Sequence, residues 1–443
     1  MIPDPAERLL GLLLLALMSR DAVYCSAWCY IEVAQRERQI FAMTTPVDSA
    51  EFFDPLNPQH VAEPDEFMRA SRKGCPVGKV SEHLYAANTD DVVRAVFDDT
   101  EHFSNRGNFS VGPEDVRLPF TVVTMADPPD HTVLRSRLLK SLAPVRLRKL
   151  TPKVENIVRK AVGTLPASGR VDLYADYVHF IPSAVVYALI GIPEPAWREV
   201  QTWSDAIVRV IPGPSHELSE FASLMEFLAQ LVEERRARPE DRHEDVLDNL
   251  CFAEPGEAEM PTPEVVCHIF QLVVAATDTT RALITNCVYR LLDDRSQWEA
   301  VVADRSLLPN AIEESLRVDS PAQFMVRTAV EDVTLAGCPI PAGKKVYLNL
   351  QSANHDEERW GDDSRTYRAD RPDAAMHLAF GKGIHACIGA PLARIEARVA
   401  IEALMDAFPG MRLAPDATWV KCEGVLTRRV ESLPVCLDGG EVR

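Results

Sequence analysis

Three things are missing from this sequence: an apolar run long enough to span a bilayer, an excess of basic charge, and paired cysteines. The most apolar stretch, LLGLLLLALM at 9–18, is far shorter than the roughly 20 residues that a spanning helix needs, which disfavours a membrane protein. A formal net charge of -19 argues against nucleic acid and anionic membranes as partners, because both attract basic surfaces. The ten cysteines are scattered without a CxxC pair, which favours a cytoplasmic location.

The composition that remains is that of a globular protein, with 47% hydrophobic and 26% charged residues. Residues 1–42 precede Met43, where MTTPVDSAEFFDPLNP begins in the manner of a cytosolic start. We interpret 1–42 as a dispensable extension, with an amphipathic membrane or partner helix and a targeting signal as alternatives. Residues 43–443 contain no repeat and no long low-complexity linker, so we expect one continuous domain.

The local patterns predict a mainly α fold with minor β. A strand is indicated near Val80–Tyr85, and the longest helix is predicted from Thr262, as the N-cap residue, to about Leu292. A second helix is predicted over Pro309–Val318, before Ser320 and Pro321. Alternating residues between Arg327 and Leu350 indicate small antiparallel strands.

The segment FGKGIHACIG at 380–389 carries the clearest chemistry. Cys387 precedes a long amphipathic helix, where the helix dipole and unpaired backbone amides favour a thiolate, the form that ligates iron. Glycines on both sides allow the backbone to approach a flat cofactor closely. A buried structural cysteine is the alternative, but it leaves the flanking Phe380, His385 and glycines unexplained.

This segment resembles the proximal haem loop of the cytochrome P-450 family, whose pattern FGxGxHxCxG is matched at every fixed position. The resemblance implies a single-domain helical prism with a small β-rich side over about 43–437. It also implies haem b with Cys387 as the axial ligand to iron, and Phe380, Gly381, His385 and Gly389 around it. The implied protein is a monomeric monooxygenase that uses O2 and electrons from a ferredoxin and its reductase.

Three further segments extend the resemblance. Glu314 and Arg317 share a helix face, and Arg371 is similar to the third member of the family's buried ion-pair network. In VVAATDTTRALI, Asp278 and Thr279 match the residues that deliver protons in the family's oxygen groove. A hydroxyl that merely bonds the preceding helix turn is the alternative for Thr279. The family commonly has glycine where Ala276 stands, so the groove is expected to be tighter or less kinked.

Haem propionates need cations, and the family's positions for them match His131, Arg135, Arg327 and His385. Between 131 and 149 the chain has basic residues and no acid, which suggests a docking patch for an acidic ferredoxin, with a solvated helix face as the alternative. The basic residues are Arg135, Arg137, Lys140, Arg146, Arg148 and Lys149.

The substrate is expected to be a small, largely apolar organic molecule, such as a secondary-metabolite intermediate, that is hydroxylated, epoxidised or otherwise oxidised. By family placement, the pocket would include Phe109, Phe120, Val274, Ala275, Phe324 and Leu426, with ordinary packing as the alternative for each. A peroxide-driven peroxygenase and a non-oxidative haem-thiolate sensor are the alternative functions.

Overall fold

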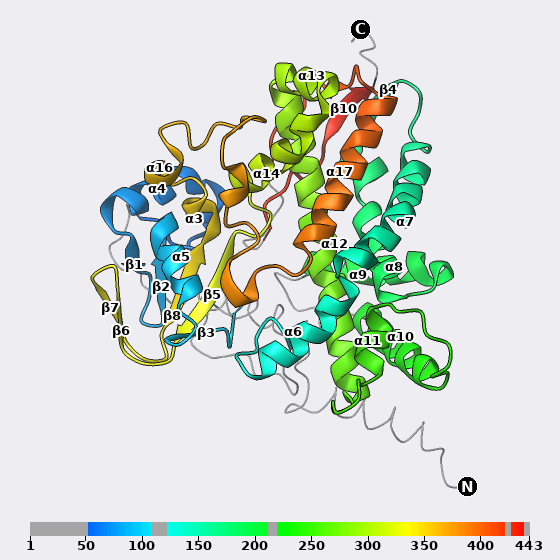
Figure 1. Cartoon of the computed structure of the whole chain (residues 1–443). Helices are drawn as coiled ribbons and strands as arrows, with labels where there is room; N and C mark the ends of the chain where they lie inside the picture. Colours follow the sequence, from blue (N-terminus) through cyan, green and yellow to red (C-terminus); the bar gives the residue numbers. More distant parts are fainter. Residues whose placement is uncertain (1–51, 109–110, 112–121, 211–218, 421–426, 438–443) are drawn as a thin grey trace. The chain divides into compact units, whose positions relative to one another are not determined.

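The structure is a computed structural model that describes residues 52–108, 111, 122–210, 219–420 and 427–437 (Figure 1). Its helices are α3 (Pro58–Ala62), α4 (Pro64–Gly74), α5 (Asp90–Asp98), α6 (Asp130–Ser141), α7 (Pro144–Val162), α8 (Ile181–Ile190), α9 (Trp197–Val210), α10 (Ser219–Arg236), α11 (Val246–Cys251), α12 (Thr262–Asp293), α13 (Arg295–Ala303), α14 (Leu308–Val318), α15 (Leu350–Ala353), α16 (Glu357–Trp360) and α17 (Ala390–Ala407). Its strands are β1 (Val77–Lys79), β2 (Leu84–Ala87), β3 (Phe103–Ser104), β4 (Gly169–Asp172), β5 (Phe324–Ala329), β6 (Val333–Leu335), β7 (Cys338–Ile340), β8 (Lys345–Asn349), β9 (Arg412–Leu413) and β10 (Pro434–Leu437). The expected mainly α fold with minor β is confirmed.

The largest sheet has the strand order β1-β2-β8-β5-β3. The pair β2 and β8 is parallel, whereas β1–β2 and β5–β8 are antiparallel. Alternation along β8 places Val346 and Leu348 in a buried apolar cluster with Phe97 of α5. Tyr347 lies between them and stacks on Phe324 of β5 at 4.5 Å between ring centres. The smaller sheets are β4-β10-β9 and β6-β7.

The described residues form two compact units, and each is built from several chain segments. Unit 1 holds Ser104–Ser141 and Ile190–Val274, which include α6, α9, α10, α11 and the first part of α12. Unit 2 holds the remaining described segments, with the helices α3–α5, α7, α8 and α13–α17 and almost all strand residues. The chain passes between the units at 103/104, 141/142, 189/190 and 274/275, so neither unit is a separate sequential domain.

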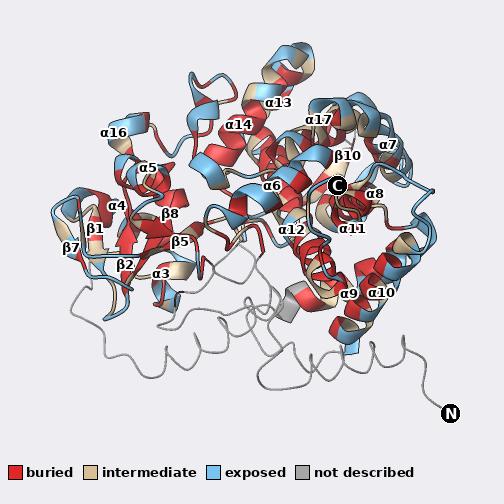
Figure 2. Ribbon diagram, turned by 60° about the horizontal axis from the view of Figure 1, so that its bottom comes forward, coloured by how far each residue is buried: buried red, intermediate tan, exposed pale blue. Residues whose placement is uncertain are grey.

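Burial follows the expected apolar periodicity in the helices that position the site. Figure 2 shows β8, β5 and α14 largely in the buried colour. In α14, Ile312 and Leu316 are buried together with Glu314 and Arg317, so this helix is enclosed on its polar side as well. No helix among the residues that the structure describes is both long and apolar enough to cross a membrane.

The helix predictions over 262–292 and 309–318 are confirmed by α12 and α14, each within one residue at both ends. The hydroxyl of Thr262 accepts a hydrogen bond from Arg236 Nη1 at 2.7 Å and donates one to Glu233, both in α10. The Thr262 hydroxyl, which we expected to cap the helix, therefore bonds Arg236 and Glu233 of another helix.

The strand predicted near Val80–Tyr85 is wrong in its position. The chain turns between β1 and β2, because the backbone amides of Val80 and Ser81 both bond the carbonyl of Leu84. The antiparallel strands predicted between 327 and 350 are confirmed by the pairs β5–β8 and β6–β7. The predicted extension over 1–42 lies outside the described residues.

Candidate functional site

Cys387 lies near the end of a tight loop, residues 380–389, that leads into α17 in unit 2. Its backbone amide donates to the carbonyl of Phe380 at 2.8 Å, which closes the loop. A short 3-10 turn, Gly383–His385, lies inside it, and α17 begins at Ala390 with Gly389 as the N-cap. The thiol therefore stands just ahead of the helix and not within its first turn. The backbone carbonyl of Cys387 accepts a hydrogen bond from the amide of Ala390 at 3.4 Å, which joins the loop to the first residue of the helix.

Glycines are required at two positions of this loop. Gly381 and Gly383 have φ values of +65° and +73°, which L side chains rarely adopt. A Cβ at Gly383 would also lie 2.8 Å from the carbonyl oxygen of Phe97, so α5 packs directly against the loop backbone. A Cβ at Gly389 would lie 3.8 Å from the sulfur of Cys387, which shows how closely this backbone passes the thiol.

Cys387 differs from the other cysteines that the structure describes, because it is the one that is exposed. Cys251, Cys267 and Cys287 are buried, and burial raises the pKa of Cys287 to about 12, so that side chain stays a thiol. Among the described residues, no three His, Cys, Asp or Glu side chains come together as a metal site. One accessible thiolate fits an iron that four porphyrin nitrogens already hold. The loop therefore fits a haem iron.

A charged group lies behind the loop. The guanidinium of Arg394, on α17, is centred 4.7 Å from the ring of Phe380 and forms two hydrogen bonds of 2.6 and 2.7 Å with Glu313 of α14. The imidazole Nε2 of His377 lies 3.3 Å from the same carboxylate, and its ring centre is 5.6 Å from that of Phe380. Burial raises the pKa of Glu313, but hydrogen bonds from Arg394 and His377 outweigh it and lower this pKa to about 2.

Asp278 and Thr279 lie in the part of α12 that belongs to unit 2. The Thr279 hydroxyl donates to the carbonyl of Ala275 at 2.7 Å, which is the local bond that we considered as the alternative. This bond uses the hydroxyl hydrogen and leaves oxygen lone pairs that can accept from a bound molecule. Ala275 is exposed and Ala276 is partly exposed, so this face of α12 is open.

Asp278 is held by an arginine from the far end of the chain. Arg429 Nε donates to Asp278 Oδ1 at 3.0 Å, and the exposed fractions of the two side chains are 17% and 15%. The same guanidinium lies 4.6 Å from the ring centre of Tyr174, in the π-helical turn Tyr174–Val178. The carboxylate is therefore fixed on the side of α12 by groups from two other segments.

Glu314, Arg317 and Arg371 form one buried network in unit 2. Arg317 donates to both carboxylate oxygens of Glu314 at 2.7 and 2.8 Å, and Arg371 Nε donates to Glu314 Oε1 at 2.6 Å. Arg317 also donates to the carbonyls of Asn354, Ser364 and Thr366. The network thus ties α14 to the segment that leads into the thiol loop.

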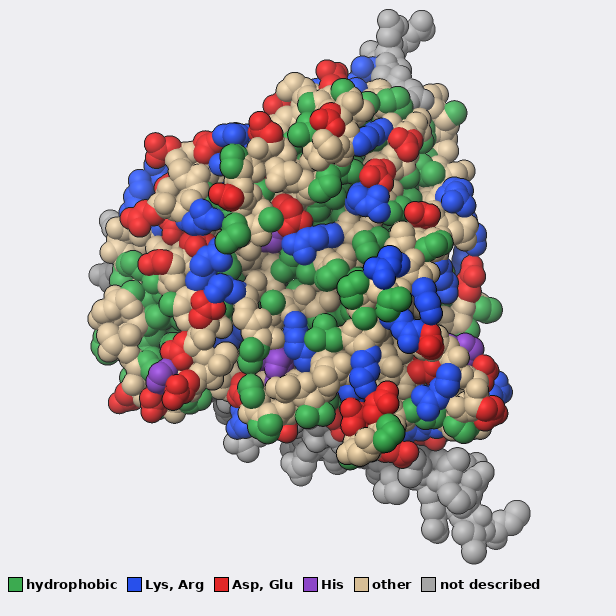
Figure 3. Space-filling model, viewed as in Figure 1, with side chains coloured by type: hydrophobic (Ala, Val, Ile, Leu, Met, Phe, Trp, Pro, Cys, Tyr) green, Lys and Arg blue, Asp and Glu red, His purple; other side chains and the backbone are tan. Residues whose placement is uncertain are grey.

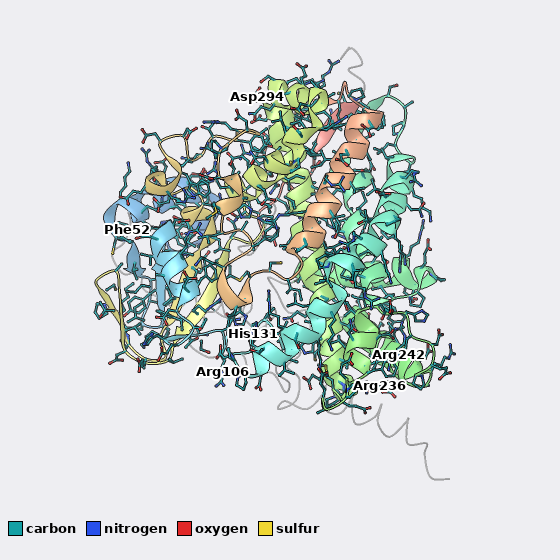
Figure 4. The ribbon with its side chains drawn as sticks, in the orientation of Figure 1. Phe52, Arg106, His131, Arg236, Arg242 and Asp294 are labelled. Carbon is teal, nitrogen blue, oxygen red and sulfur yellow. The ribbon has the colours of Figure 1, made fainter. Side chains whose placement is uncertain are left out.

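The expected propionate-binding residues lie in both units. Arg327, on β5 of unit 2, is buried, with its guanidinium 5.2 Å from the ring centre of Phe97, and His385 lies in the thiol loop. His131 and Arg135 lie in α6 of unit 1, where Figure 4 labels His131. Burial lowers the pKa of His131, and the charge of Arg135 lowers it further, so this imidazole is neutral at pH 7.

The basic segment between 131 and 149 is not uniformly solvated. Arg137 is buried, with Nε 3.2 Å from Glu257 and Nη2 donating to the carbonyl of Ala258 at 2.6 Å. Lys140 lies 3.4 Å from Glu254. The assignment of Arg137 to a docking patch is wrong, because its side chain is buried and already pairs with Glu257. Lys140 is exposed, so its place in a docking patch stays a prediction.

The structure describes three of the expected pocket residues. Ala275 is exposed on the face that carries Thr279, whereas Val274 is buried. Phe324 is 3% exposed and stacks on Tyr347, so it packs as a core residue of the main sheet. Phe109, Phe120 and Leu426 lie outside the described residues.

Sequence reasoning missed two sets of residues beside the site. Arg429, the partner of Asp278, is 151 residues away from it. Glu313 and Arg394 are 81 residues apart, and His377 lies between them in the sequence. No local pattern marks these pairs, because single charged residues on helices and loops are usually solvated.

Comparison with known proteins supports the same assignment. The family model for cytochrome P-450 matches residues 194–410. The 6-deoxyerythronolide B hydroxylase of Saccharopolyspora erythraea is 34% identical, over 74% of this chain and 81% of that protein. The vitamin D(3) 25-hydroxylase of Pseudonocardia autotrophica is 35% identical, over 73% and 81%. The structure of CYP109E1 from Bacillus megaterium in complex with testosterone has a TM-score of 0.76 at 29% identity, and covers 85% of this chain and 99% of that chain.

The fold and the exposed thiol loop define a haem-thiolate protein, and the chain belongs to the cytochrome P-450 family. The cofactor of this family is haem with a cysteine thiolate as the axial ligand. Within the family the chain is a bacterial-type monooxygenase that acts on a small molecule.

Proposed function

We propose that this chain is a ferredoxin-dependent monooxygenase in which Cys387 is the axial ligand to haem iron. The observation that carries the proposal is the loop itself. It presents one exposed sulfur after Gly381 and Gly383, whose positive φ values disfavour other residues, and at Gly383 a Cβ would also lie 2.8 Å from the carbonyl oxygen of Phe97. When bound, the haem supplies the activation of dioxygen, and the chain supplies orientation, electron access and protons.

Thr279 and Asp278 are the residues that we propose for proton delivery. The Thr279 hydroxyl is held by Ala275, so its oxygen stays in one orientation and can accept a hydrogen bond on the open face of α12. Asp278 can take a proton from solvent and pass it through water, since its carboxylate keeps some exposure beside Arg429. This pair favours dioxygen over peroxide as the oxidant, because peroxide brings its own protons.

We propose that His131, Arg135, Arg327 and His385 hold the two haem propionates. Arg327 is suited to this because it is always charged and its planar guanidinium can donate two parallel hydrogen bonds to a carboxylate. A nearby carboxylate raises the pKa of His131 again, so the imidazole can take up a proton and donate a charge-assisted hydrogen bond to that carboxylate.

We infer that a ferredoxin docks on the first half of α7 in unit 2. The basic residues of this half of α7 are Arg146, Arg148, Lys149 and Lys153. The one acid in the whole of α7 is Glu155. Figure 3 shows basic side chains among hydrophobic ones over α7 and α17. Ile384, in the thiol loop, is 37% exposed and offers an apolar contact close to Cys387. A basic surface on a chain of net charge -19 attracts an acidic partner.

Charge reversal tests this docking surface. Arg146→Glu with Arg148→Glu should raise the KM for ferredoxin several-fold at low salt, and added salt should reduce the difference. Arg159→Glu with Lys160→Glu, at the other end of α7, is the matched control with the same charge change. Unchanged ferredoxin kinetics in the first variant, with unchanged haem content, would remove this surface from the proposal.

We propose a small, largely apolar organic substrate that is hydroxylated or epoxidised, such as an intermediate of secondary metabolism. The names of the relatives support this class, since one is a hydroxylase of 6-deoxyerythronolide B and another a vitamin D(3) 25-hydroxylase. Ala275, exposed beside Thr279, offers an apolar surface to such a molecule.

The first test is the absorption spectrum of the reduced, carbon-monoxide-bound protein. Wild type should show the strongly red-shifted Soret band of thiolate ligation, and Cys387→Ser should lose it while keeping the fold. Cys436→Ser, at a partly exposed cysteine of β10, is the control and should keep the band. A haem-loaded, folded wild type without the band would contradict the assignment of Cys387.

A further inference from the structure

The ion pair that packs against the thiol loop joins one cation and one anion, so it carries no net charge. Arg394 and Glu313 share two hydrogen bonds of 2.6 and 2.7 Å, and Glu313 is buried at 8% exposure. The backbone amide of Ala379 donates to His377 Nδ1 at 3.1 Å, so the proton of this imidazole is on Nε2, facing Glu313. Burial lowers the pKa of His377, which therefore stays neutral beside the pair.

The pair reaches the cysteine in two ways. Arg394 covers the ring of Phe380 at 4.7 Å, and the carbonyl of Phe380 accepts the amide of Cys387 at 2.8 Å. Glu313 raises the pKa of Arg394 most, through its hydrogen bonds, and a Cys387 thiolate also raises it by its charge. The guanidinium is thus within electrostatic range of the thiolate, while its position depends on Glu313.

We propose that Arg394 and Glu313 form a charge-balanced unit that keeps either of its charges from shifting the reduction potential of haem bound to Cys387. The inference rests on the proposed function, in that it takes Cys387 as the axial ligand. Reduction adds one negative charge to the cofactor, so a nearby uncompensated cation favours the ferrous state and an uncompensated anion favours the ferric state. The intact pair largely cancels both effects, and removal of one partner exposes the other.

The test is a signed double-mutant cycle on the haem-loaded protein. Glu313→Gln leaves the arginine uncompensated and should raise the reduction potential, whereas Arg394→Gln should lower it. The double variant should return close to wild type. Arg394 stands seven positions after Cys387 in the sequence, and we take their charges to be on the order of 10 Å apart. At an effective dielectric constant of about 20, one charge at that range changes the ferrous-to-ferric ratio roughly tenfold, which is about 59 mV for one electron.

Two controls separate this effect from a general disturbance of α17. Arg398 and Glu402 form a matched pair on the same helix, with 2.8 Å between Arg398 Nη1 and Glu402 Oε2, but farther from the loop. Arg398→Gln and Glu402→Gln should leave the potential nearly unchanged. The titrations are run near pH 8.5, so that His377 does not supply a replacement positive charge.

Opposite shifts that cancel in the double variant would support the proposal. Shifts of the same sign, or no shift while the carbon-monoxide complex keeps its red-shifted Soret band, would overturn it and leave Cys387 as the ligand. Loss of that band in wild type would overturn the thiolate assignment itself. If the pair had only a structural role, both variants would lose stability and haem content, but their reduction potentials would not shift in opposite directions.

Discussion

Replacement of Arg317 by methionine gives the sharpest test of how the fold supports the thiol loop. Arg317 is fully buried and donates to both oxygens of Glu314 and to the carbonyls of Asn354, Ser364 and Thr366. Methionine fills a similar volume but donates nothing. Glu314 Oε1 keeps its bond from Arg371, whereas Oε2 loses its bond from Arg317 in a buried site.

The expected cost follows from these contacts. Breaking a buried ion pair by removal of one partner typically costs about 3–5 kcal/mol, and the retained bond from Arg371 to Glu314 places the expected cost at the lower end of that range. A domain has a free energy of unfolding of about 5–15 kcal/mol, so Arg317→Met should lose a large part of it. Arg317→Lys keeps the charge but loses the planar guanidinium, so its free energy of unfolding should lie between those of wild type and Arg317→Met.

Urea unfolding followed by far-ultraviolet circular dichroism measures this loss, and the haem-to-protein ratio reports the state of the loop. Arg398→Met removes a surface pair on α17 and should cost no more than about 1 kcal/mol. The reasoning is refuted if Arg317→Met unfolds within about 1 kcal/mol of wild type and binds haem fully.

Three further predictions concern residues in and beside the site. Because the folded pKa of Glu313 is about 2, below its ordinary value, its stabilisation is present above about pH 4.5 and is lost as the pH falls toward 2. The gap in unfolding free energy between wild type and Glu313→Gln, at most about 3 kcal/mol, should therefore shrink from pH 6 to pH 3, and a constant gap would contradict the lowered pKa. Thr279→Ala should keep the haem spectrum but lower product formed per electron pair by at least about tenfold, with the rest released as peroxide, and unchanged coupling would exclude its role in proton delivery. Arg429→Gln removes the 3.0 Å bond that holds Asp278 and should change the solvent isotope effect on turnover, whereas an identical isotope effect would mean that this pair does not limit proton transfer.

Much of the site's chemistry was predictable because it is contiguous. The residues 380–389 close a loop on themselves, through the bond from the Cys387 amide to Phe380, and the glycines that it needs stand in the same stretch. The helices α12 and α14 were predictable for the same reason, since their apolar periodicity and their terminal residues are local.

The strand near Val80–Tyr85 shows where local patterns fail. The stretch is apolar enough for a strand, but the carbonyl of Leu84 captures two backbone amides and turns the chain before β2 begins. The basic segment fails for a related reason. Charge alone predicts a solvated face, yet Arg137 is buried against Glu257, which lies in another part of the chain.

The sequence by itself determined the haem-thiolate class, through a cysteine, two required glycines and their spacing within ten residues. Only the tertiary structure decided that Arg429 holds Asp278 and that Arg394 and Glu313 balance each other behind Phe380. The physical reason is the range of the interactions. Backbone conformation and helix periodicity depend on neighbouring residues, whereas ion pairs between residues 81 or 151 positions apart depend on the path of the whole chain.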